Sequence, residues 1–84
     1  MKDILRLAQE SFLNSKPCER IVYLRRYLNM TQKEFAEKCI ISEKCVWNWE
    51  KGHTFPTKRN QKIIASVLGV NEKTIFGSPK EYKF

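Results

Sequence analysis

Residues 31–52 of this chain read TQKEFAEKCIISEKCVWNWEKG, a pattern typical of two short helices joined by a few residues. Thr31 followed three residues later by Glu34 is a capping box. In this motif the hydroxyl accepts a hydrogen bond from a first-turn N–H, and the carboxylate reaches back to the N–H of the capping residue. The spacing predicts a helix over residues 32–39 with an apolar face formed by Phe35, Ala36 and Cys39.

The second half of the stretch predicts another helix, which Ser42 can cap and which Gly52 follows as a C-terminal glycine. Val46 and Trp49 are three residues apart and share an apolar face. Trp47 and Trp49 are separated by one residue, so they cannot both face the same side of a helix. Trp49 is therefore expected in the core, and Trp47 is expected to point outward.

The flanking sequence predicts further helices and no convincing strand. Pro17 suits the first turn of a helix running to about Leu28, because its missing N–H would have no intrahelical partner there. The apolar stripe of this helix is Ile21, Leu24 and Leu28. After a polar loop that contains Pro56, a helix is expected over residues 58–68. Asn71 can cap a last short helix over residues 72–76.

The predicted fold class is therefore all-α. An amphipathic pattern near the N-terminus predicts an additional helix within residues 1–15. Residues 16–77 are expected to form one domain, and residues 78–84 a C-terminal tail.

The chain is basic, with sixteen Lys and Arg against nine Asp and Glu and a formal net charge of +7. The excess lies in residues 16–29 and 52–70, whereas residues 31–51 are balanced. Such a bias attracts polyanions, either nucleic acid or anionic lipid, and composition does not choose between them.

Several classes of protein are disfavoured by the sequence. No stretch approaches the roughly 18 apolar residues of a membrane span, and the N-terminus lacks the apolar core of a signal peptide, so a cytoplasmic protein with no membrane partner is predicted. Enzyme motifs such as HExxH, GxGxxG, GxSxG and the P-loop are missing, so no enzyme is expected.

The cysteines Cys18, Cys39 and Cys45 are odd in number and form no CxxC pair, and the single histidine is His53. A Cys/Cys/His metal site is conceivable. Reduced, partly buried thiols explain these residues better, so neither a metal nor a cofactor is predicted.

An ordered set of motifs runs through residues 18–77. The chain carries, in order, Ile21-x-x-Leu24-Arg25-x-x-Leu28, Met30-Thr31-Gln32-x-Glu34-Phe35-Ala36, Ile41-Ser42, Val46-x-x-Trp49-Glu50-x-Gly52, Pro56 and Ile64-Ala65-x-x-Leu68-Gly69-Val70. This set resembles the phage repressor and Cro-like helix-turn-helix proteins, also called XRE-type regulators. The resemblance implies a lambda-repressor-like five-helix domain that binds DNA, here preceded by the additional N-terminal helix.

A helix that reads the major groove needs one face anchored in the core and a polar face opposite. In the helix over residues 43–51, the outward residues expected to contact bases are Glu43, Lys44, Trp47, Asn48 and Lys51. Lys44 can donate to guanine O6 or N7, Asn48 can pair with adenine N6 and N7, and Glu43 can accept from cytosine N4.

The resemblance also implies roles outside the base-reading face. Gln32, at the start of the preceding helix, is expected to contact a backbone phosphate. Ser42, Thr54, Lys58 and Arg59 are expected to be further phosphate contacts. Arg25 and Glu50 are expected to form a partly buried structural ion pair, because an unpaired charge there would cost several kcal/mol.

The sequence departs from the family pattern at three places. Ile40 occupies the turn position usually held by glycine, and a β-branched residue is strained at positive φ, so a remodelled turn is expected. Lys58, Gln61 and Lys62 stand where family members tend to carry leucines, and the N-terminal helix is expected to cover this thinner apolar face. Trp47 replaces a small or polar residue; a thymine methyl or sugar, a neighbouring side chain and a protein contact are its three open roles.

These features predict a sequence-specific double-stranded DNA-binding transcriptional regulator, a repressor of phage, mobile-element or antitoxin type. Family members usually bind palindromic operators as homodimers. Candidate dimer surfaces are the N-terminal helix, or the last helix with its tail through Ile75, Phe76, Tyr82 and Phe84. The alternative is a protein-interaction module, such as a toxin-masking antitoxin, that retains the fold with weak or no DNA binding.

Overall fold

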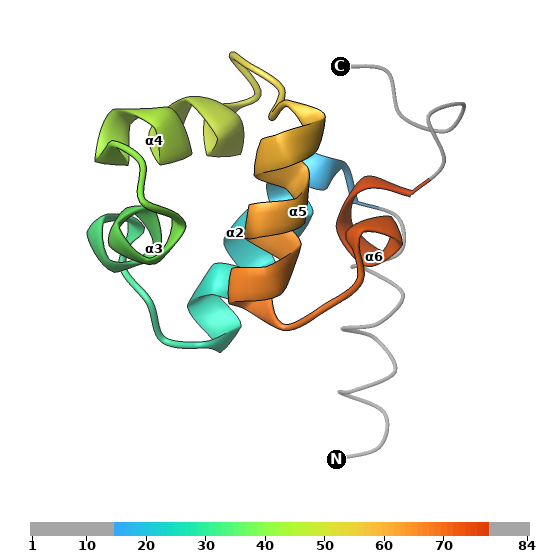
Figure 1. Ribbon diagram of the computed structural model, residues 1–84, viewed down its shortest axis with the longest axis horizontal. Coiled ribbons are helices and arrows are strands. Elements are labelled where there is room, and N and C mark those ends of the chain that lie inside the picture. Colours follow the sequence, from blue (N-terminus) through green and yellow to red (C-terminus); the bar gives the residue numbers. More distant parts are fainter. Residues whose placement is uncertain (1–14, 78–84) are drawn as a thin grey trace.

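The computed structural model describes residues 15–77, which form a bundle of helices (Figure 1). The helices in this range are α2 (Pro17–Tyr27), α3 (Gln32–Cys39), α4 (Glu43–Lys51), α5 (Lys58–Leu68) and α6 (Glu72–Phe76). The predicted all-α class is thus confirmed. The additional helix predicted within residues 1–15 and the tail 78–84, with Tyr82 and Phe84, lie outside the described residues apart from Ser15. None of the described helices is long and apolar enough to cross a membrane.

Side-chain caps explain where three of the helices begin. The Thr31 hydroxyl accepts from the N–H of Glu34 at 3.0 Å, and the Glu34 carboxylate accepts from the N–H of Thr31 at 2.9 Å. Ser42 and Thr57 cap α4 and α5 in the same way at 3.2 Å each. Asn71 occupies the N-cap position of α6, but its side chain makes no capping hydrogen bond. These short-range bonds place the starts of the helices where the sequence predicts them.

One core joins the helices. Helix α4 packs on α2 and α3, whereas α5 packs on α3 and α6, and α6 returns to α2. In Figure 1, α5 crosses the middle of the domain with α3 and α4 on one side and α6 on the other. The core residues are Ile21, Phe35, Ala36, Cys39, Val46, Trp49, Ile64, Ala65, Leu68, Ile75 and Phe76. On the sequence alone, Ile75 and Phe76 are candidates for a dimer surface. Both side chains are buried within the monomer, so they are not available for such a contact.

The C-terminal end of α2 differs from the prediction. Leu28 was expected on the apolar stripe with Ile21 and Leu24, but α2 ends at Tyr27 and Leu28 is 42% exposed. Asn29 then adopts a left-handed conformation with φ of 58°. This left-handed residue follows the C-cap residue Leu28 and turns the chain toward α3.

The turn between α3 and α4 keeps its left-handed conformation despite the β-branched residue. Ile40 has φ of 58° and ψ of 50°, and the N–H of Ile41 donates to the carbonyl of Ala36 at 3.0 Å. The expected remodelling of this turn is therefore wrong. Because the Ile40 side chain is 90% exposed, it contributes almost no burial to offset the backbone strain.

Candidate nucleic-acid interface

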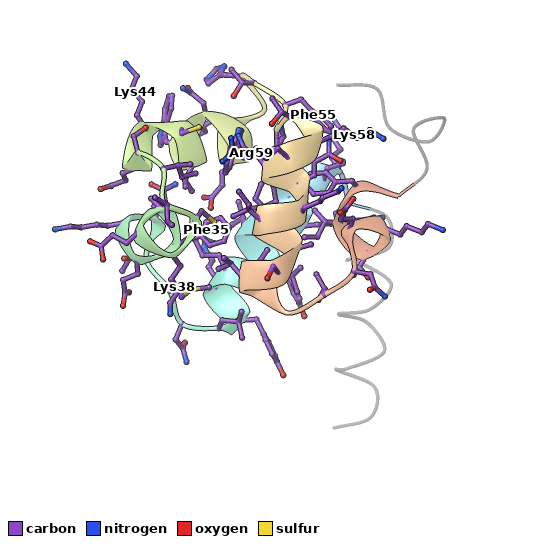
Figure 2. The ribbon with its side chains drawn as sticks, viewed as in Figure 1. Phe35, Lys38, Lys44, Phe55, Lys58 and Arg59 are labelled. Atoms are coloured by element: carbon purple, nitrogen blue, oxygen red, sulfur yellow. The ribbon has the colours of Figure 1, made fainter. Side chains whose placement is uncertain are left out.

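Helix α4 has two chemically distinct faces. Val46 and Trp49 are 0% and 3% exposed, so they hold one side of the helix in the core. Four of the five predicted base contacts are exposed: Glu43, Lys44, Trp47 and Lys51. The fifth, Asn48, is half-buried. Figure 2 shows Lys44 projecting away from α4 into solvent. An anchored helix with a polar outer face is the arrangement that major-groove reading requires.

The end of α4 is fixed by a glycine turn. Gly52 adopts φ of 76°, a left-handed conformation in which an L side chain is strained. The carbonyl of Asn48 then accepts from the N–H of His53 at 2.9 Å and of Thr54 at 3.4 Å. The chain consequently folds back over the last turn of α4, and this brings His53 beside the outward face.

Apart from Gln32, the predicted phosphate contacts lie directly before this helix in the chain, at Ser42, and after it, at Thr54, Lys58 and Arg59. The hydroxyl of Ser42 accepts from the N–H of Cys45, which leaves its own hydrogen available for donation. Thr54, Lys58 and Arg59 are exposed in the loop after α4 and in the first turn of α5. In Figure 2, Lys58 and Arg59 lie at the end of α5 that is level with α4; Arg59 is on the α4 side of α5, and Lys58 is on the side toward α6, where it lines a pocket with Glu72 and Phe76.

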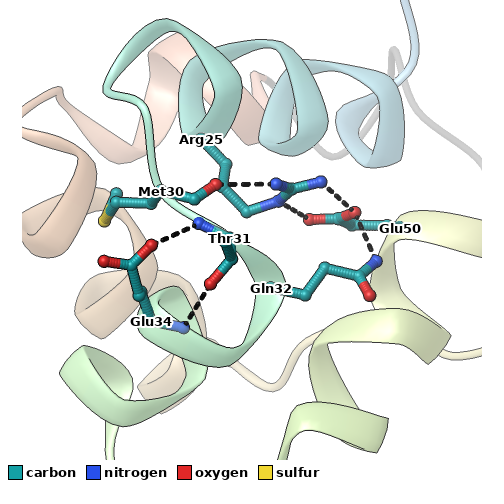
Figure 3. Close-up of polar contacts among 6 residues, drawn as sticks. All are labelled: Arg25, Met30, Thr31, Gln32, Glu34 and Glu50. Carbon is teal, nitrogen blue, oxygen red and sulfur yellow. Dashed lines mark hydrogen bonds and ion pairs between the residues drawn. The ribbon is translucent and has the colours of Figure 1, made fainter.

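Arg25 and Glu50 form a buried, two-point ion pair (Figure 3). Arg25 Nε lies 2.6 Å from Glu50 Oε2 and Nη2 lies 3.0 Å from Oε1, and the two side chains are 8% and 5% exposed. Arg25 Nη1 also donates to the carbonyl of Met30 at 2.8 Å. This pair ties the end of α2 to the last turn of α4, and the contact to Met30 ties it to the turn before α3.

Gln32 joins this network. Its side-chain nitrogen donates to Glu50 Oε1 at 2.9 Å (Figure 3). The predicted role of Gln32 is donation to a DNA phosphate. An amide nitrogen carries two hydrogens, so donation to Glu50 and donation to a phosphate are compatible. The contact to Glu50 restrains the amide at the N-terminus of α3.

Trp47 rests on two neighbours. Its ring centroid lies 5.3 Å from that of His53 with the planes tilted by 34°, and Lys51 Nζ lies 6.0 Å from the indole centroid. The indole nevertheless remains 41% exposed. Of the three roles considered for Trp47, contact with neighbouring side chains is therefore present, and the exposed part of the ring is still accessible to a partner.

Comparison with known proteins supplies the family. A family model described as helix-turn-helix matches residues 21–75. The chain belongs to the helix-turn-helix family. The resemblance stated from the motifs is thereby confirmed, and the α3–turn–α4 unit is the helix-turn-helix of this domain.

A curated relative matches more than half of the chain. This helix-turn-helix chain is 40% identical over 50 residues to the HTH-type transcriptional regulator DicA of Escherichia coli strain K12. The matched region is 60% of the chain and 37% of the relative, so the chain spans little more than a third of that protein's length. No solved structure matches at a comparable level of significance.

Two features of the helix-turn-helix domain were missed from the sequence. Arg20 was counted in the basic excess, but it is 4% exposed and its Nη1 donates to the carbonyls of Thr74 and Ile75 at 3.1 and 3.4 Å. Arg20 therefore holds the last turn of α6. Its charge is buried and does not contribute to the binding of a polyanion. The ring contact of His53 was also missed, since it depends on the chain reversal at Gly52.

The cysteines of the domain are free thiols. Cys39 is buried, and burial, with a smaller contribution from Cys45, raises its pKa to about 11. Within residues 15–77, no three His, Cys, Asp or Glu side chains are grouped so that they could hold a metal ion.

Proposed function

We propose that this helix-turn-helix domain binds double-stranded DNA in a sequence-specific manner as part of a transcriptional regulator, with α4 in the major groove. The observation that carries the proposal is the division of α4 into a buried anchor, Val46 and Trp49, and an exposed polar face that bears Lys44. A helix held in this way can enter the groove without unfolding the domain. The similarity to the Escherichia coli protein, which is named as a transcriptional regulator, supports the same interpretation.

Roles within the interface follow from chemistry. On this proposal Lys44 and Asn48 read base edges, with Glu43 and Lys51 beside them, because ammonium, amide and carboxylate groups match different base edges. Gln32, Ser42, Thr54, Lys58 and Arg59 hold the backbone on either side of α4. Such contacts set the orientation of the protein and carry no direct sequence information.

We further propose that the regulator is a repressor of phage, mobile-element or antitoxin type that binds a palindromic operator as a homodimer. The support for this is the family resemblance. Two-fold symmetry then requires half-sites separated by about one helical turn, roughly 34 Å.

The test is selection of bound duplexes from a random library, repeated with Lys44→Ala and Asn48→Ala. Each variant is expected to lose its base preference at one position of the selected site. Its binding free energy for the duplex selected by the parent protein should be weaker by about 1 to 3 kcal/mol. Lys38→Ala is the matched control, because Lys38 is exposed on α3 and lies on the side of that helix away from α4 in Figure 2. Enrichment of no duplex by the parent would refute the proposal.

Salt dependence separates base readers from backbone contacts. Removal of one phosphate contact is expected to weaken all sequences alike and to reduce the slope of log affinity against log salt by about one. Lys58→Ala and Arg59→Ala should show this behaviour, whereas Asn48→Ala should leave the slope unchanged because the amide carries no charge.

The second candidate is a protein-interaction module. It is favoured by exposed apolar side chains away from the outward face of α4: Tyr27 is 74% exposed and Leu28 42% exposed at the end of α2. A partner that covers them would bind with little dependence on salt. Binding to a protein partner that is lost in Tyr27→Ala, together with failure to shift any duplex, would establish this function in place of the first.

A further inference from the structure

The outward face of α4 carries one large apolar surface among polar groups. Trp47 exposes 41% of its area, whereas Trp49 two residues later exposes 3%. The other exposed side chains on this face, Glu43, Lys44 and Lys51, are charged, and half-buried Asn48 is polar. A polar face that meets only phosphates and polar base edges has no need of an indole.

Two neighbouring side chains contact the indole. Lys51 follows Trp47 by four residues, so both lie on the same face of α4, and its ammonium is 6.0 Å from the indole centroid. In addition, the left-handed turn at Gly52 and the hydrogen bond from the N–H of His53 to the carbonyl of Asn48, 2.9 Å, bring the imidazole centroid to 5.3 Å from the indole centroid. These contacts restrict the rotamers of Trp47 before any partner arrives, which lowers the entropy lost on binding.

The exposed surface selects a particular base chemistry. In the major groove guanine, cytosine and adenine present hydrogen-bond donors and acceptors, and thymine alone adds an apolar group, the 5-methyl. An indole cannot satisfy several polar groups at once, since its single N–H is its only donor, but its ring can bury a methyl group.

We infer that Trp47 reads the 5-methyl group of thymine, and that His53 and Lys51 position the indole for this contact. The inference rests on the proposed function and adds a base chemistry to it. His53 is a positioning residue in this account, because it acts through the indole.

The experiment uses the duplex selected by the parent chain, with each thymine replaced singly by deoxyuridine. This replacement removes one methyl group and leaves the hydrogen-bonding edge unchanged. Burial of one methyl corresponds to about a fourfold change in affinity. We expect about fourfold weaker binding at one thymine of each half-site, measured as the ratio of the dissociation constants of the uracil and thymine duplexes.

The variants assign the effect to the indole. Trp47→Ala should bind the thymine and uracil duplexes equally, whereas the control Tyr27→Ala, which removes an exposed aromatic side chain outside α4, should keep the parental ratio. His53→Ala should reduce the ratio, and His53→Phe, which retains a ring against the indole, should restore it. A purely structural role of His53 would alter the melting temperature and leave this ratio unchanged, so each variant is also melted.

Each remaining outcome overturns the inference in a distinguishable way. If the parent binds a duplex but no thymine is sensitive to loss of its methyl, Trp47 does not read thymine, and the proposed function stands. A sensitive thymine whose ratio persists in Trp47→Ala assigns the methyl contact to another residue. Failure to bind any duplex removes the proposed function and this inference with it.

Discussion

Replacing Glu50 by alanine tests the role of the buried ion pair. The substitution removes both oxygens that accept from Arg25, at 2.6 and 3.0 Å, and the oxygen that accepts from Gln32 at 2.9 Å. Arg25 is left with one contact, to the carbonyl of Met30. The Arg25 side chain is only 8% exposed and its guanidinium cannot lose its charge, so the group must remain desolvated or disrupt the packing of α2.

The expected cost is large relative to the stability of the domain. Breaking a buried pair by removing one partner costs about 3 to 5 kcal/mol. A chain of 84 residues has a total unfolding free energy of about 4 to 13 kcal/mol. Since 1 kcal/mol shifts the melting temperature of a small domain by about 4 to 8 °C, Glu50→Ala should melt at least about 12 °C below the parent.

The assay is urea and thermal unfolding followed by circular dichroism at 222 nm, the wavelength at which helices dominate. Lys51→Ala, which removes the exposed neighbour of Glu50, is the matched control and should unfold like the parent. The double variant Arg25→Met with Glu50→Leu should lose less stability than Glu50→Ala, because no buried charge is left unpaired. If Glu50→Ala unfolds within about 0.5 kcal/mol of the parent, the pair does not stabilise the fold and this reasoning is wrong.

Three further changes probe local features. Ile40→Gly should stabilise the domain by about 1 kcal/mol in urea unfolding, because it relieves a left-handed residue that buries almost nothing; a loss of stability would contradict this. Cys39 should resist iodoacetamide at pH 8 in the native protein and react in urea, as followed by peptide mass spectrometry, because a thiol with a pKa of about 11 is almost fully protonated. Equal rates in the two states would refute this burial effect. Hydrogen bonds from the backbone N–H and then the hydroxyl of Thr31 lower the pKa of Glu34, so its stabilisation is present above pH 4.5, the ordinary value, and is lost as pH falls through the lowered one. The difference in melting temperature between the parent and Glu34→Ala should therefore be constant above pH 5 and shrink in acid; a difference that grew in acid would show the opposite sign.

The elements most accurately predicted from the sequence are those fixed by local chemistry. Thr31 and Ser42 each start a helix by accepting a hydrogen bond from the N–H three residues ahead, and Gly52 ends one through its left-handed φ. The division between Val46 and Trp49 on one face and Lys44 on the other follows from helical periodicity alone. Helix-end hydrogen bonds and helical periodicity both depend on residues that are close together in the sequence, so they can be predicted without knowledge of the tertiary structure.

Features that depend on tertiary packing were predicted poorly. Nothing in the local sequence of Arg20 indicates that it caps α6 more than fifty residues away, and its charge was assigned to the surface. Leu28 satisfied the helical period but lies beyond the last turn of α2. Gln32 was interpreted only through a partner outside the protein, whereas the structure gives it one inside, Glu50. Ile40 shows the reverse error, since the left-handed end of α3, with its hydrogen bond from the N–H of Ile41 to the carbonyl of Ala36, forms despite the conformational preference of Ile40.

The separation of scaffold and reading residues along α4 has a consequence for how such a domain diversifies. Val46, Trp49 and Glu50 hold the helix, while the side chains that face outward at Glu43, Lys44 and Trp47 contribute little to the core. Surface substitutions away from packed features usually change stability by about 0.5 kcal/mol or less, so changes on the outward face can accumulate with little loss of stability. On the proposed function, a lineage can therefore acquire a new operator by a handful of exposed substitutions, and Arg25 and Glu50 can remain the same throughout.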